Sequence, residues 1–192
     1  EHSTSNRRRG KWYLRPIDCW MYSQYSRIIA ISEKAAELLA QHIGRNDISV
    51  IENGIDVQRY AQATPIDRHA IVPDYHTSDI IITMVAAFRV GKDQDSAIRA
   101  LTHLSENYKL CLVGDGERRN IIEALIAQLG LQQRVLLLGI RSDVPQILSA
   151  SDVVVLASHW EGFGLAAVEG MATKKPLIAT NVDGLAQVIS GA

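Results

Sequence analysis

Residues 151–180 read SDVVVLASHWEGFGLAAVEGMATKKPLIAT, and this stretch decides the fold. Two short apolar runs, residues 153–157 and 177–180, flank a segment of helical composition, residues 163–173. A strand, a helix and a second strand in this order form a βαβ unit, whose two strands are parallel. The stretch therefore predicts an α/β protein with a parallel sheet.

The same alternation of strands and helices extends through the rest of the chain. The predicted strands are residues 28–31, 49–51, 80–86, 110–113, 135–138, 153–157 and 177–180. The predicted helices are residues 16–25, 32–43 with Ser32 as N-cap, 93–104, 117–129, 144–150, 164–172 and 184–189. Most strands are apolar throughout, which indicates that both sheet faces are covered. Right-handed crossovers then predict one open, doubly wound, Rossmann-like sheet, with an irregular connection over residues 61–79.

The composition is that of an ordinary globular protein: 192 residues, 47% hydrophobic and 21% charged. A net charge of −1 gives no electrostatic case for a nucleic-acid partner. With only Cys19 and Cys111, the chain is expected in a reducing compartment. No apolar run approaches the ~18–20 residues that a membrane span needs. We therefore expect a cytoplasmic location, with room for peripheral contact at the inner face of the membrane.

The loop between residues 157 and 165 carries the most informative polar residues. Glu161 and Glu169 are separated by seven residues, and Gly162 and Gly164 allow the backbone to approach a ligand closely. The first N–H groups of the following helix have no partners within the helix, and such an end attracts phosphate. Ionised carboxylates accept hydrogen bonds from sugar hydroxyls. The pattern predicts a sugar-nucleotide site, although two solvated glutamates near a helix start would look the same.

Three further strand-end motifs accompany this loop. Asn53-Gly54 is a turn sequence after a short strand. Arg89 and Lys92 place two cations after the strand at residues 80–86, and Gly114 lies in a glycine-containing turn after the next strand. Each motif alone is weak, but loops at the carboxyl ends of parallel strands converge on one crevice.

Together and in this order, the motifs resemble the retaining glycosyltransferases of family 4, which have the two-domain B-type glycosyltransferase fold (GT-B). The resemblance covers about residues 27–190 and rests on RIIAIS, VIENGID, MVAAFRVGKDQD, LVGDGE, LLLGIRSDV and the 151–180 stretch. It implies transfer of a hexose-type sugar, with retention of configuration, from a nucleoside diphosphate such as UDP to a polysaccharide or lipid-linked glycan. It also implies that no metal or other cofactor is required.

The resemblance assigns the loop between residues 157 and 165, called the acidic loop below, to the binding of the donor. Glu169 would hold the ribose hydroxyls and Glu161 would contact the donor sugar. Phe163, Gly164 and Leu165 would offer backbone N–H groups to the sugar or the diphosphate.

It assigns the other strand-end loops to the nucleotide. Arg89 and Lys92 would neutralise the diphosphate and the charge that develops as it leaves. The loop around Ile140 and Arg141 would lie against the base, and Gly114 belongs to the same donor site.

The chain departs from the family pattern at Ala87, where many members carry an arginine. Arg89 lies two residues later, and on extended backbone an i+2 neighbour points to the same side.

His2 matches a histidine that faces the acceptor and the reacting carbon in the family. Residues 1–26 would be the tail of an amino-terminal acceptor domain and residues 27–192 an incomplete donor domain. A fragment of this kind is expected to bind a donor weakly and to be inactive alone.

Several signals have a second interpretation. Asp93-Gln94-Asp95 resembles a metal-binding Asp-x-Asp, but acids are favoured at a helix start, and capping is the preferred interpretation. Arg7-Arg8-Arg9, followed by Lys11, Trp12 and Tyr13, could contact anionic lipid, although an exposed terminus is favoured. A non-catalytic sugar-nucleotide or glycan-binding module and a nucleotide-sugar epimerase remain the alternative functions. Hydrolysis by Ser158-His159 is disfavoured because no Gly-x-Ser-x-Gly turn is present.

Overall fold

The computed structural model describes residues 11–190. The described chain divides into two compact units. Unit 1 contains residues 11–54, 160–165 and 181–190, and unit 2 contains residues 55–159 and 166–180. None of the helices in residues 11–190 is both long and apolar enough to cross a bilayer.

Unit 1 is built on a short pair of parallel strands. Its elements are a 3₁₀ turn (Trp12–Leu14), α1 (Arg15–Ser23), β1 (Ile28–Ala30), α2 (Glu33–Ile43), β2 (Ile48–Val50) and α8 (Asp183–Ser190). β1 pairs with β2 in the register Ile28 to Ile48. The Ser32 hydroxyl accepts a hydrogen bond from the Ala35 N–H (3.3 Å) and so caps α2, as the sequence predicts.

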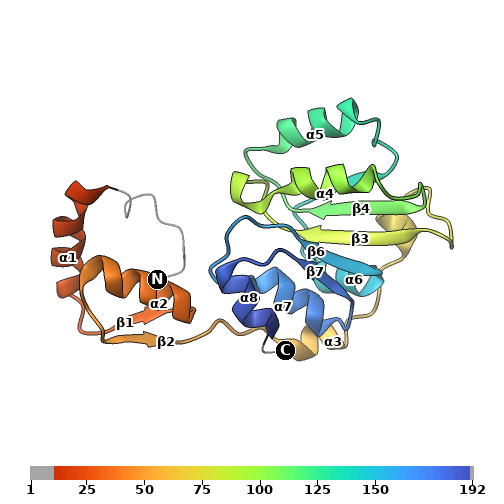
Figure 1. Ribbon diagram of the computed structural model, residues 1–192. Helices are drawn as coiled ribbons and strands as arrows, with labels where there is room; N and C mark the ends of the chain where they lie inside the picture. Colours follow the sequence, from red (N-terminus) through yellow and green to blue (C-terminus); the bar gives the residue numbers. More distant parts are fainter. Residues whose placement is uncertain (1–10, 191–192) are drawn as a thin grey trace. The chain divides into compact units, whose positions relative to one another are not determined.

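Unit 2 is a five-stranded parallel sheet with helices on both faces. Its strands are β3 (Ile80–Val85), β4 (Tyr108–Val113), β5 (Val135–Gly139), β6 (Val153–Leu156) and β7 (Leu177–Ala179), in the spatial order β5-β4-β3-β6-β7. Its helices are α3 (Val57–Ala61), α4 (Gln94–Leu101), α5 (Arg119–Gln128), α6 (Val144–Ala150) and α7 (Leu165–Ala172), and 3₁₀ turns lie at Arg68–Ala70 and Val90–Lys92. α4 and α5 lie on one face of the sheet, and α3 and α6 on the other (Figure 1).

The core of unit 2 explains why its strands are apolar throughout. Leu110, Cys111, Leu112 and Val113 of β4 are all at most 2% exposed, because helices cover both faces of this strand. Burial raises the pKa of the Cys111 thiol to about 12, so this cysteine is a neutral core residue. The doubly wound parallel sheet predicted from the sequence is confirmed.

A hydrogen-bond network anchors the connection between α3 and β3. Arg68 donates to both carboxylate oxygens of Asp152 (2.6 and 3.2 Å), and Asp152 also accepts from the Ile81 N–H (2.8 Å). This pairing raises the pKa of Arg68. A connection of irregular sequence is therefore fixed to the amino end of the sheet by a contact between residues 84 positions apart.

All seven predicted strands are present, but three predictions need correction. The strands do not form one open sheet, since β1 and β2 pair only with each other. Helix α3 was not predicted and begins where the Asp56 side chain accepts a hydrogen bond from the Arg59 N–H (3.1 Å). The α4 helix also ends at Leu101 rather than at residue 104, and Arg134 donates to the carbonyls of Leu101, Leu104 and Ser105 at this end. The predicted domain boundary after residue 26 stays a prediction.

Candidate functional site

The loops at the carboxyl ends of β3, β4, β5 and β6 are joined by backbone hydrogen bonds. The link between β3 and β4 is Ala86 N–H to Val113 O (3.0 Å), and that between β4 and β5 is Gly114 N–H to Gly139 O (2.8 Å). The His159 N–H after β6 donates to Gly91 O after β3 (2.9 Å). The predicted convergence of these loops is therefore confirmed, and it occurs where the strand order reverses between β3 and β6.

Gly114 makes the contact between the first two loops possible. Its φ is +134°, and a Cβ placed there would lie 2.1 Å from the Ala86 carbonyl oxygen. Only glycine allows both this backbone conformation and this approach. The turn after β4 is therefore seated directly on the end of β3.

Arg89 and Lys92 lie in the loop after β3. Phe88, fully buried, anchors this loop: its N–H donates to Asp115 O (3.0 Å), and its carbonyl accepts from the Arg118 N–H (3.1 Å). Arg89 is exposed, whereas Lys92 is half-buried at the end of the 3₁₀ turn. The structure thus places both cations at the carboxyl end of the sheet.

The backbone between Ala87 and Arg89 is not extended, so the prediction that the two side chains point to the same side is wrong in its premise. The Arg89 N–H donates to the Ala87 carbonyl (2.9 Å), so the chain bends at Phe88 rather than continuing extended. The i+2 rule applies to strands and does not apply to this turn. Whether Arg89 replaces the missing arginine stays a prediction.

The start of α4 fixes the other end of this loop. Asp93, with φ +51°, accepts from the Ser96 N–H (3.3 Å) and the Ser96 hydroxyl (2.6 Å), which confirms the predicted capping role. The fully buried Gln94 donates its side-chain amide to the Ala87 carbonyl (3.0 Å). Among residues 11–190, no group of three His, Cys, Asp or Glu side chains could hold a metal ion.

The loop after β5 presents Ile140 and Arg141. Ile140 is 85% exposed, which is high for an apolar side chain. Arg141 donates to both oxygens of Asp143 (2.8 and 2.6 Å), and this hydrogen bonding lowers the pKa of Asp143 and raises that of Arg141. The loop thus offers an exposed apolar side chain beside a guanidinium held in a fixed plane.

Glu169 lies on α7 and has a partner that sequence reasoning missed. Tyr60 of α3 is only 9% exposed, and its pKa is raised to about 12 by burial and by a hydrogen bond to Glu169. The Tyr60 phenol therefore stays protonated beside the Glu169 carboxylate. The Asp56 cap therefore starts a helix that places Tyr60 beside Glu169.

The residues from Glu161 to Leu165 belong to unit 1. Phe163 is buried, Gly164 has φ +85°, and Leu165 begins α7. A Cβ at Gly184 of α8 would lie 2.4 Å from Glu161 O and 2.5 Å from Gly162 O. The backbone of the acidic loop therefore rests on the first turn of α8.

The remaining predicted site residue, His2, lies outside the described residues. Tyr60, Gln94 and Gly184 are the positions that the sequence analysis missed. The Asp-Gly pair before an apolar helix was a usable signal for Gly184, whereas Tyr60 and Gln94 resemble ordinary helical residues in the sequence.

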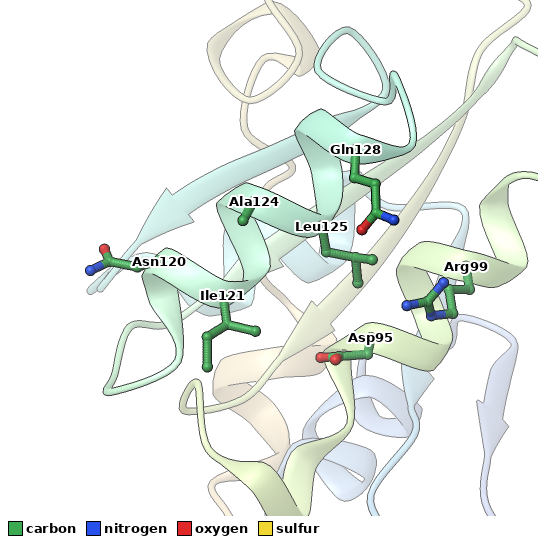
Figure 2. Close-up of a pocket in the computed structure, with 7 residues that line it drawn as sticks. All are labelled: Asp95, Arg99, Asn120, Ile121, Ala124, Leu125 and Gln128. Atoms are coloured by element: carbon green, nitrogen blue, oxygen red, sulfur yellow. The ribbon is translucent and has the colours of Figure 1, made fainter.

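A separate pocket of about 410 Å³ lies between α4 and α5 (Figure 2). It is lined by Asp95 and Arg99 of α4 and by Asn120, Ile121, Ala124, Leu125 and Gln128 of α5. Ile121 and Leu125 point from α5 toward α4 (Figure 2). None of the predicted site residues lines this pocket, so we do not assign it to the donor.

Both parts of the chain match models of glycosyltransferase families. Residues 69–191 match the family model described as Glycosyl transferases group 1, and residues 1–59 match that of Glycosyltransferase Family 4. The chain is 33% identical over 168 residues to an Escherichia coli UDP-Gal:alpha-D-GlcNAc-diphosphoundecaprenol alpha-1,3-galactosyltransferase, covering 83% of the chain and 43% of that protein.

Solved structures agree with this result. Anabaena HepE in complex with UDP and glucose superposes with a TM-score of 0.77 at 27% identity, over 90% of this chain and 49% of HepE. WaaG, a glycosyltransferase of lipopolysaccharide biosynthesis, shares the fold with a TM-score of 0.75 at 24% identity, over 86% of this chain and 47% of WaaG. The chain thus spans about half the length of these relatives. The predicted GT-B fold is confirmed, and the chain belongs to the family Glycosyl transferases group 1.

Proposed function

We propose that this chain is the donor-binding part of a retaining glycosyltransferase that takes a hexose-type sugar from UDP. The observation that carries the proposal is the set of joined loops at the carboxyl ends of β3, β4, β5 and β6. These loops bring two cations and a glycine turn to the switch point of a parallel sheet, which is where such sheets bind nucleotides.

The nucleotide end of the donor is assigned to unit 2. Lys92 and Arg89 neutralise the diphosphate, and the exposed Ile140 beside the fixed Arg141 plane contacts the base. Glu169 accepts hydrogen bonds from the two ribose hydroxyls. Tyr60 donates to that carboxylate and thereby holds it in position for the ribose.

The sugar end is assigned to the acidic loop and its helix start. Glu161 accepts hydrogen bonds from the sugar hydroxyls, and the N–H groups at Phe163, Gly164 and Leu165 contact the sugar or its phosphate. His2 is proposed to face the reacting carbon and the acceptor.

In the proposed reaction, the bond between sugar C1 and the diphosphate oxygen breaks, and the acceptor oxygen bonds to C1 on the same face. The acceptor proton leaves with the diphosphate. Negative charge builds on the leaving group, so fixed cations such as Lys92 lower the barrier electrostatically. We propose that this role needs no metal ion.

The relatives support a UDP-linked donor through their printed names. The Escherichia coli relative uses UDP-Gal and a diphosphoundecaprenol-linked acceptor, and HepE was solved with UDP and glucose. We extend this to a polysaccharide or lipid-linked glycan acceptor and a role in polysaccharide biosynthesis. We place the protein in the cytoplasm, since Cys19 and Cys111 are free thiols.

Titration with UDP and UDP-glucose, by calorimetry and by NMR at high protein concentration, tests the donor site. Glu169→Gln and Lys92→Ala should each weaken UDP binding by about tenfold, the loss of one charge-assisted contact. Glu106→Gln and Lys109→Ala are matched controls, because both residues lie near the opposite, amino end of β4. A well-folded chain that binds neither compound, or binds UDP equally with both site variants, would refute the proposal.

A non-catalytic sugar-nucleotide module is the second candidate, favoured by Ala87 and by the bend at Phe88. The double variant Ala87→Arg/Arg89→Ala tests the diphosphate contact, whereas turnover separates the two candidates. If Arg89 serves the diphosphate, Arg89→Ala should weaken UDP binding and the added Ala87→Arg should restore it. The chain joined to its natural upstream sequence should also release UDP from a donor, and an epimerase would instead yield an isomerised donor.

A further inference from the structure

A row of large apolar side chains on α1 and the turn before it is exposed to solvent. Trp12 is 84% exposed, Tyr13 55%, Ile17 54% and Trp20 68%. Tyr13, Ile17 and Trp20 follow the i, i+4, i+7 spacing of one helix face. Trp12 stacks edge-on against Tyr13, with ring centroids 6.2 Å apart. We call these four residues the aromatic stripe.

The opposite face of α1 already has its partners within unit 1. Asp18 accepts from His42 of α2 (3.0 Å) and is 4% exposed. Cys19 and Tyr22 pack against the cluster of Ile28, Leu39 and Ile43. Because this face binds β1 and α2, which α1 flanks (Figure 1), the aromatic stripe points away from the strand pair.

Positive charge is concentrated in the amino-terminal part of the sequence, which includes the aromatic stripe. Residues 1–27 hold six Lys and Arg against two acids, whereas residues 28–192 hold 14 against 19. Lys11 directly precedes the stripe and is exposed, whereas Arg15 donates to the carbonyls of His42 (2.8 Å) and Gln41 (3.4 Å) in α2, and Asp18 is buried on the inner face. The stripe is therefore an apolar, aromatic surface within a positively charged stretch of sequence, on a chain that is otherwise negative.

We propose that the aromatic stripe docks the protein onto an anionic lipid surface. Trp and Tyr rings favour the boundary between headgroups and acyl chains, and nearby Lys and Arg are attracted to anionic headgroups. A nine-residue helix is too short to span a bilayer, so α1 would lie in the plane of the interface. This proposal stands independently of the proposed sugar-nucleotide site.

Vesicle binding tests the proposal with the 192-residue chain. Vesicles of phosphatidylcholine, alone or with about one-third phosphatidylglycerol, are co-sedimented with the protein at about 0.05 M and about 0.5 M salt. We expect binding to the anionic vesicles only, weakened by salt, together with a blue shift of tryptophan emission. Trp12→Gln/Trp20→Gln should reduce the partition coefficient by about tenfold or more. Both side chains are mostly exposed, so this variant should fold.

Matched controls make the result specific. Ile121→Gln/Ile178→Gln removes two exposed apolar side chains from unit 2, 54% and 62% exposed, and should leave vesicle binding unchanged. The tryptophan variant should keep its UDP affinity. Vesicle binding therefore tests the lipid proposal, and UDP affinity tests the donor site independently.

Three results would overturn the proposal. The first is equal binding to both kinds of vesicle, or none. The second is self-association that the tryptophan variant abolishes, which would make the stripe an interface between two copies. The third is a chain carrying its natural upstream sequence in which Trp12 and Trp20 are shielded from a quencher and vesicle binding is absent.

Discussion

Tyr60→Phe should destabilise the protein by an amount that depends on pH. Tyr60 is 9% exposed, and its pKa is raised to about 12, first by burial and further by hydrogen bonding to Glu169. The substitution removes the hydroxyl and keeps the ring. At neutral pH the loss of a hydrogen bond to a charged group should cost about 1.5–3 kcal/mol.

The pKa gives the magnitude of the pH dependence. A rise from the ordinary value of 10.0 to about 12 corresponds to about 2.7 kcal/mol, at about 1.36 kcal/mol per unit. The folded pKa lies above the unfolded one, so this stability is fully present below pH 10 and is lost as the pH rises through 12. About 1.4 kcal/mol, half of the total, should be lost by pH 11.

Urea unfolding of the wild type and of Tyr60→Phe at pH 8 and pH 11 measures this effect. The wild type should be the more stable at pH 8, and the difference should shrink by about 1.4 kcal/mol at pH 11. Subtracting the variant removes contributions from other groups that titrate at high pH. Tyr25→Phe, which removes a phenol that is 55% exposed, is the matched control.

A difference between wild type and variant that is equal at both pH values would refute the reasoning, and so would no difference at pH 8. A second measurement connects Tyr60 to the proposed function. If Tyr60 positions Glu169 for the ribose, Tyr60→Phe should also weaken UDP binding about fivefold, equivalent to roughly 1 kcal/mol.

Three further substitutions test other contacts of the fold. Gly114→Ala should cost about 3 kcal/mol or more, since its Cβ would overlap the Ala86 carbonyl, and should lower Tm by about 6–12 °C in a calorimeter. Gly184→Ala should destabilise the protein similarly or displace α8, whereas Gly54→Ala, with open space around it, is the control that should leave Tm nearly unchanged. Arg68→Met should lower the free energy of unfolding in urea by about 1–2 kcal/mol, because it leaves Asp152 without its guanidinium partner; an unchanged value would show that the pair is too exposed to matter.

Local sequence patterns were sufficient to predict most of the architecture. Short apolar runs marked the strands, and the Ser32 and Asp93 caps followed from short-range rules. The separation into two sheets could not be predicted in this way, because β1 and β2 resemble the other strands locally. Their pairing depends on which strands meet in space.

The candidate site likewise has a part that local sequence predicts and a part that depends on long-range contacts. Loops at strand ends converge as a consequence of parallel topology, so the sequence could place Arg89, Lys92 and Gly114 at one edge. The groups that hold the site are contacts at long range: Tyr60 meets Glu169 across more than a hundred residues. The local sequence around a tyrosine in a short helix does not indicate that partner.

The loop after β3 shows what this distinction means for the proposed phosphate contact. The direction of Arg89 is set by the bend at Phe88, which peptide groups of residues 115 and 118 hold in place. Lys92 is held by local features instead, since its N–H donates to Arg89 O (3.0 Å) and the Asp93 cap follows it directly. Lys92 is also the more buried of the two cations, so its charge is less screened by solvent. Its interaction with a diphosphate should therefore be the stronger one, and Lys92→Ala should cost more UDP affinity than Arg89→Ala.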